Sequence, residues 1–69
     1  MWIRSQDRDL LVDVSFIEVV GNAIFALRDG ESNTLGHFLT EKRAKDELTA
    51  IERWIDDGVE GVYQVGALK

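Results

Sequence analysis

The sequence predicts a small α+β domain, in which a short antiparallel β-meander carries one α-helix on one face and is followed by a short C-terminal strand. Two observations predict this fold class. Up to residue 39, apolar residues occur in short runs separated by Gly, Asn and Asp, which is typical of strands joined by turns. From residue 44 onward, apolar residues recur at helical spacing instead. With 69 residues, the chain is expected to form a single domain, residues 1–69.

Six strands are expected. Gly21 and Asn22 separate two apolar runs and predict a tight hairpin turn, because both residue types tolerate positive φ. Asp29 and Gly30 start the next turn, which residues 31–33 are expected to lengthen. The predicted strands span residues 1–5, 10–14, 16–20, 23–28, 34–39 and 62–65.

One apolar stripe predicts a helix between Thr40, its N-cap, and Asp57, with Gly58 as the stop. Trp54 widens the stripe on one side, and Glu47 is expected where that side meets solvent. The stripe consists of Ala44, Leu48, Ile51 and Ile55, at spacings of four, three and four. The helix is expected to pack in the core through these four residues.

Composition limits the classes of partner and cofactor. The chain has 13 acidic and 8 basic residues, a net charge of −5, which argues against binding duplex DNA because DNA binding requires an excess of Lys and Arg. It has no cysteine and a single histidine, His37, so we expect no disulfide, no metal site and no cofactor. No apolar run approaches the ~20 residues of a membrane span, and the opening residues lack the features of a signal peptide. We therefore expect a cytoplasmic protein that has no membrane partner.

A chain this short buries little apolar surface. It removes only ~60% of its unfolded surface from water, so burial barely offsets the conformational entropy lost on folding. Small domains are usually stabilised further by disulfides, by metals or by self-association. Because the first two are not expected, the sequence predicts a homo-oligomer, most simply a two-fold dimer.

No convincing catalytic set is present, so the chain is not expected to be an enzyme and no catalytic residue is assigned. His37 shares a strand face with Leu35 and Leu39 and is interpreted as a half-buried residue hydrogen-bonded to backbone. No sequence signal places a serine nucleophile near it. The acidic pairs Asp7/Asp9 and Asp56/Asp57 are interpreted as solvated charges.

Trp2, Arg4 and Tyr63 form the candidate binding site. Trp, Tyr and Arg are enriched in binding hot spots, and they also stack on bases and pair with phosphate. Trp2 and Arg4 are two residues apart and project from one strand face, and the strand of Tyr63 is expected beside them. A guanidinium and two rings would then share one face, suited to an anionic planar ligand or an acidic protein. The alternative is that both Trp2 and Trp54 are core residues and that Arg4 offsets nearby carboxylates.

Several segments suggest a family. The chain opens with Met1-Trp2-Ile3-Arg4-Ser5-Gln6-Asp7, a later strand contains Leu35-Gly36-His37-Phe38, and Val62-Tyr63-Gln64 follows the helix. In this order the segments resemble small proteins of uncharacterised function from Gram-positive bacteria and from their phages and mobile elements. In that family Met-Pro would follow Tyr-Gln, whereas this chain has Val65-Gly66. The resemblance implies a protein of a phage or mobile element that works inside a bacterial cell. It implies no catalytic residue and no cofactor.

Two classes of function are therefore favoured over an enzyme. The first is a non-catalytic binding protein of a phage or mobile element that acts on a host protein in defence or regulation. The alternative is a homo-oligomeric binder that sequesters a small anionic, nucleotide-type signal. The first requires an apolar patch or an exposed strand edge, and the second requires a pocket with convergent Arg and aromatic groups.

Overall fold

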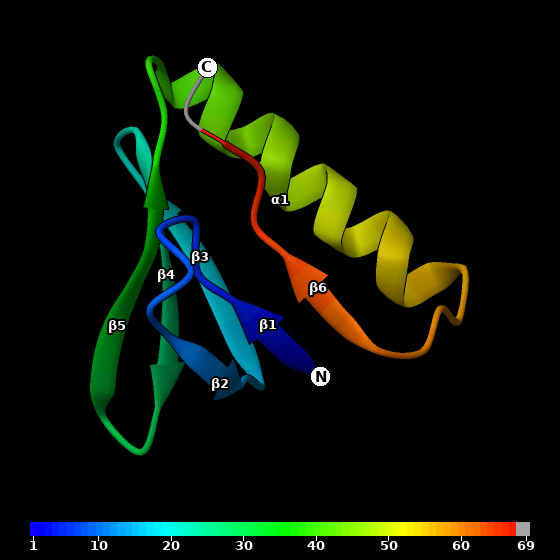
Figure 1. Cartoon of the computed structure of the whole chain (residues 1–69). Helices are drawn as coiled ribbons and strands as arrows, with labels where there is room; N and C mark the ends of the chain where they lie inside the picture. The colour runs from blue at the N-terminus through cyan, green and yellow to red at the C-terminus, as the bar shows by residue number, and fades with distance from the viewer. Residues whose placement is uncertain (68–69) are drawn as a thin grey trace.

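The computed structural model describes residues 1–67. In chain order the elements within these residues are β1 (Trp2–Arg4), β2 (Leu11–Asp13), β3 (Phe16–Val20), β4 (Ala23–Arg28), β5 (Glu31–His37), α1 (Glu41–Asp56) and β6 (Val62–Gln64) (Figure 1). The predicted α+β class is confirmed, with an antiparallel meander, a helix and a C-terminal strand. The strands divide into two three-stranded sheets. We call β2-β1-β6 sheet A and β3-β4-β5 sheet B.

Two short hairpin turns build the meander of sheet B. Gly21 has a φ of +60° and takes the first central position of a two-residue turn, where a residue with positive φ suits the twist of the strands. Asp29 and Gly30 both have positive φ, 52° and 82°, and form the second turn alone. Residues 31–33 therefore belong to β5, and the prediction that they lengthen the turn is wrong. The tight turn places Glu31 directly opposite Arg28.

Sheet A joins the two ends of the described chain. β1 pairs with β2 in antiparallel orientation and with β6 in parallel orientation. The expectation that the last strand lies beside the first is confirmed. In this register Ile3 stands between Val12 and Tyr63, and Arg4 stands between Leu11 and Gln64.

A β-bulge in β5 changes which side chains face inward. Gly36 pairs with Ile24 whereas Thr34 pairs with Phe25, so Leu35 is an extra residue, and it is buried. His37 consequently lies on the outer face of the strand and is exposed. The predicted half-burial of His37 is wrong, because simple alternation does not continue through the bulge.

The hydrophobic core lies on one face of sheet B. Ile24 and Ala26 of β4 are buried there together with Ile3 of β1 and with Ala44 and Ile51 of α1. Sheet A and α1 therefore cover the same face of sheet B, as the arrangement in Figure 1 illustrates. The opposite face of sheet B has neither element upon it.

The helix begins and ends close to the predicted positions. The Thr40 side chain accepts a hydrogen bond from the Arg43 N–H at 3.1 Å, which caps the N-terminus, and Gly58 follows the C-cap with a φ of +66°. Ile55 is 59% exposed, so its predicted place in the core is wrong. Within the described residues, no helix is long and apolar enough to cross a membrane.

Trp54 and Glu47 lie on the side of α1 that faces β6. The Trp54 ring meets the Tyr63 ring edge to face, with centroids 5.3 Å apart. The Glu47 carboxylate accepts hydrogen bonds from the Tyr63 hydroxyl at 2.8 Å and from the Gly66 N–H at 2.9 Å. Glu47 therefore connects α1 to β6 and to the segment after it, in addition to lying at the edge of the apolar stripe.

Candidate functional site

Trp2 and Arg4 share the outer face of sheet A, as predicted. Both side chains are exposed, and the strands on either side add two more exposed apolar residues, Leu11 and Val62. Trp2 is therefore a surface residue, whereas Trp54 is partly buried between α1 and β6.

Tyr63 does not join this face. It pairs with Ile3, whose side chain is fully buried, and it therefore points to the opposite side of sheet A, toward α1. The expectation that two rings and the guanidinium share one face is wrong, because parallel pairing aligns Tyr63 with Ile3 and not with Trp2. Burial and the adjacent Glu47 carboxylate raise the pKa of the Tyr63 hydroxyl above its usual value.

A hollow of about 310 Å³ lies beside Arg4 and Arg8 on the outer side of sheet A. Leu11 and Val62 contribute to its walls. The Arg4 Nε donates to the Arg8 carbonyl at 3.1 Å, so the two residues are held together. Arg8 has a φ of +69°, a conformation that costs a non-glycine residue free energy. Asp9 also lines the hollow, so two basic residues and one acidic residue surround it.

The Gln6 side chain has a structural role. Its amide nitrogen donates to the His37 carbonyl at 2.8 Å and to the Gly66 carbonyl at 3.0 Å, and its oxygen accepts from the His37 N–H at 3.0 Å. A Cβ at Gly36 would lie 3.0 Å from the Gln6 Cβ, so the glycine permits this close approach. Gln6 thus ties the β1–β2 turn to β5 and to the segment after β6.

Ser5 and Asp7 shape the same turn. The buried Ser5 hydroxyl donates to the Asp7 carboxylate and accepts from the Leu10 N–H at 3.1 Å. The Asp7 carboxylate also accepts from the Asp9 N–H at 3.0 Å. These two hydrogen bonds, first the one from Ser5, hold the pKa of Asp7 below its ordinary value.

The segments that carry the family resemblance meet one another in the fold. Gln6 contacts the backbone on either side of Gly36, and the Gln64 side chain donates to the Ser5 carbonyl at 2.9 Å. Much of that pattern is therefore explained by the junction between the two sheets. The resemblance does not by itself mark a binding site.

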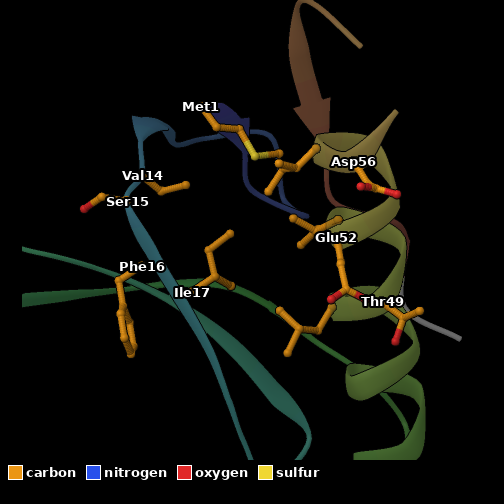
Figure 2. Close-up of a pocket in the computed structure, with 11 residues that line it drawn as sticks. Met1, Val14, Ser15, Phe16, Ile17, Thr49, Glu52 and Asp56 are labelled. Atoms are coloured by element: carbon orange, nitrogen blue, oxygen red, sulfur yellow. The ribbon is translucent and has the colours of Figure 1, made fainter. Parts of the chain in front are cut away.

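A groove of about 560 Å³ lies between α1 and β3 (Figure 2). Figure 2 shows Met1 and Ile17 pointing into the space between the strand and the helix, while the Phe16 ring points away from the helix. The apolar side chains that line the groove are Met1, Val14, Phe16, Ile17, Leu48, Ile51 and Ile55. The polar lining residues are Ser15, Thr49, Glu52 and Asp56.

The apolar stripe of the helix did not predict this groove, because all four of its residues were expected in the core. Ile51 is buried, but Leu48 is only partly buried and Ile55 is exposed, so the outer part of the stripe forms a groove wall. Only the placement of β3 against the helix reveals that the stripe is incompletely covered.

The helical wall of the groove is acidic. Glu52 and Asp56 are four residues apart on α1, where like charges destabilise a helix by a few tenths of a kcal/mol. Within residues 1–67 neither carboxylate forms an ion pair, whereas Lys42–Asp46 and Glu41–Lys45 pair at 3.0 Å on the same helix. Asp56 also lies in the last turn, where the helix dipole disfavours negative charge. An apolar groove with an unpaired acidic border suits a cationic, partly apolar ligand.

Neither a metal site in the described part of the chain nor a match to known proteins indicates a function. Across residues 1–67 no group of three or more His, Cys, Asp or Glu side chains is arranged to hold a metal ion. Comparisons with protein-family models, with curated proteins and with solved structures found no match to this chain.

Proposed function

We propose that this chain is a non-catalytic binding protein whose α1–β3 groove accepts the apolar side of a short basic, amphipathic helix from a partner protein. The observation that carries the proposal is the groove, with its apolar lining and unpaired acidic helical wall. Such helices dock through residues spaced three and four apart into apolar grooves.

The dimensions suit this occupant. The helical wall runs from Leu48 to Asp56, nine residues, or ~13 Å at ~1.5 Å per residue. A partner helix of two to three turns spans the same length and presents two or three apolar anchors along it. A volume of about 560 Å³ is within the usual range of binding pockets.

The acidic wall of the groove favours a basic partner helix. Lys or Arg on the flanks of the partner helix would face Glu52 and Asp56, and the net charge of −5 would speed the encounter. Affinity should therefore fall as salt concentration rises.

The resemblance to small proteins of Gram-positive bacteria, phages and mobile elements supplies the biological setting of the proposal. In that setting the chain acts in the bacterial cytoplasm on a host protein of defence or regulation. It acts as a homo-oligomer, most simply a two-fold dimer, because a chain of 69 residues with no disulfide gains stability from association.

A second candidate function rests on the hollow beside Arg4 and Arg8. Arg4 and Arg8 line the hollow together with one acidic residue, Asp9, and the two guanidinium groups favour a small anionic ligand, as in a homo-oligomer that sequesters a nucleotide-type signal. The α1–β3 groove does not suit this ligand, because Glu52 and Asp56 would repel phosphate.

A pair of synthetic peptides tests the first proposal. One is a helical Leu/Lys amphipathic peptide, and the other has Glu in place of every Lys. Isothermal titration calorimetry should detect binding of the Lys peptide only, and Ile55→Glu should weaken it at least about tenfold. Leu39→Glu is the matched control, since Leu39 is also an exposed apolar residue but lies outside the groove.

The same variants separate the candidates. In pull-downs from a Gram-positive lysate, with mass spectrometry of proteins and small molecules, Ile55→Glu should remove a specific host protein that Leu39→Glu retains. Loss of a co-purified anionic metabolite in Arg4→Ala, with unchanged peptide binding, would favour the second candidate. Equal binding of both peptides, or binding insensitive to Ile55→Glu, would reject the groove.

A further inference from the structure

The outer face of sheet B is an uncovered apolar surface. Strand pairing aligns its side chains in three rows across β3, β4 and β5. The rows are Phe16-Leu27-Ser32, Glu18-Phe25-Thr34 and Val20-Ala23-His37. Sheet A and α1 both pack on the other face, which carries Ile24 and Ala26.

Burial confirms that this surface is separate from the core. Phe16 and Val20 are 56% and 57% exposed, and Phe25 and Leu27 are only partly buried. None of these four side chains packs against the core cluster, in contrast to Ile17 and Val19, which alternate with them along β3. Antiparallel sheets commonly expose one face, but that face is normally polar. Here five of the nine positions are apolar; four of them are exposed or partly buried, and the fifth, Ala23, is buried at 4% exposure.

We propose that this face, which we call the sheet B outer face, binds a second copy of the chain and forms a two-fold dimer by sheet-on-sheet packing. The inference rests on the dimer of the proposed function and assigns it a surface. In a two-fold interface residue i contacts residue j and j contacts i, and only residues near the axis meet their own symmetry mates, so like charges must be absent from the axis. The central position is Phe25, and the face carries one carboxylate, Glu18, in a chain of net charge −5.

The position of Glu18 selects the orientation of the two copies. A two-fold axis across the strands would place β3 on β3 and bring the two Glu18 carboxylates together. An axis along the strands places β3 of one copy on β5 of the other, so that Glu18 faces Thr34 and Phe25 faces Phe25. The second arrangement avoids repulsion between like charges and resembles the aligned packing of β-sandwich sheets.

The area of the sheet B outer face limits how tightly two copies can associate. Three strands about 4.8 Å apart, each ~20 Å long, give the face a footprint of roughly 280 Å² before the relief of the side chains is counted. Stable interfaces bury ~800 Å² per partner, so this dimer belongs to the small, dissociating class.

Val20→Asp tests the assignment. Val20 is exposed in the monomer, so the substitution should leave folding intact while placing a charge in the interface. Sedimentation velocity of the full chain, from about 10 μM to about 1 mM, covers the range expected for an interface of this size. The wild type should shift toward twice its 7.8 kDa mass as concentration rises, and Val20→Asp should raise the dimer dissociation constant at least about tenfold.

Leu11→Asp is the matched control. Leu11 is 54% exposed, close to the value for Val20, but lies on the outer face of sheet A. It should leave the dimer intact. A second test, Thr34→Arg, should strengthen the dimer by placing a cation opposite Glu18 of the other copy.

The inference is overturned if the wild type stays monomeric throughout this range, or if Leu11→Asp and not Val20→Asp abolishes association. Its failure is distinguishable from that of the groove. Ile55→Glu should abolish binding of the Leu/Lys peptide without changing the dimer, whereas Val20→Asp should abolish the dimer and leave peptide binding unchanged.

Discussion

Replacing Gln6 by Ala should destabilise the fold strongly for a residue outside the core. The side chain makes three hydrogen bonds, two to the backbone of His37 and one to the Gly66 carbonyl. A net contribution of ~0.5–1.5 kcal/mol for each gives ~1.5–4.5 kcal/mol. Two of the three bonds are exposed, so water replaces part of what is lost and ~2 kcal/mol is expected.

That loss is large for a chain of this length. At ~0.05–0.15 kcal/mol per residue, a domain this small has a free energy of unfolding of only ~3–10 kcal/mol. The melting temperature should fall by roughly 10 °C, since ~1 kcal/mol corresponds to ~4–8 °C in a domain of this size. Circular dichroism melts and urea titrations, at one protein concentration, measure both quantities.

Gln6→Glu is a second test of the hydrogen bonds made by Gln6. It keeps the shape of the side chain but directs a carboxylate oxygen at the carbonyls of His37 and Gly66, which have no proton to donate. It should therefore destabilise at least as much as Ala. Wild-type melting behaviour in both variants would refute the structural role assigned to Gln6.

Three further predictions concern stability and titration. Ile51→Ala should cost ~2–5 kcal/mol in chemical denaturation because Ile51 is fully packed, whereas Leu48→Ala in the groove wall should cost less than half as much. The chain has one tyrosine, so the near-ultraviolet absorbance of phenolate reports Tyr63 alone; its midpoint should lie above 10.0, and Glu47→Gln should lower it in part. Because the folded pKa of Tyr63 is raised, its contribution to stability is complete below pH ~10 and is lost as pH rises further. The folded pKa of Asp7 is lowered, so its contribution is present above pH ~4 and is lost as pH falls; Asp7→Asn should flatten that acid dependence in denaturation curves. Equal costs for Leu48→Ala and Ile51→Ala would contradict the first prediction. A phenolate midpoint at or below 10.0 would contradict the second. Unchanged acid dependence of stability in Asp7→Asn would contradict the third.

The sequence predicted the elements well because their signals are local. Turn residues such as Gly21 and Gly30, and the cap at Thr40, act within a few residues, so the strand and helix boundaries were close to those observed. The main error in the elements, residues 31–33, arose because these polar residues were interpreted as part of the turn, although Asp29-Gly30 is itself a signal for a two-residue turn.

The site was less predictable because it depends on register and on distant contacts. Trp2 and Arg4 were placed correctly on one face by simple alternation within a strand. The direction of Tyr63 depends on how β6 aligns with β1, and the role of Gln6 depends on contacts 31 and 60 residues away. The groove depends on the gap between β3 and α1, which no periodicity in either element encodes.

Mapping of backbone amide shifts by NMR, during titration with the Leu/Lys peptide, shows whether the α1–β3 groove binds a basic amphipathic helix. We expect the largest shifts in residues 15–17 and 48–56, with saturation at equimolar peptide and weakening at high salt. Shifts centred on Arg4, Arg8 and Leu11, or no shifts at all, would contradict the claim.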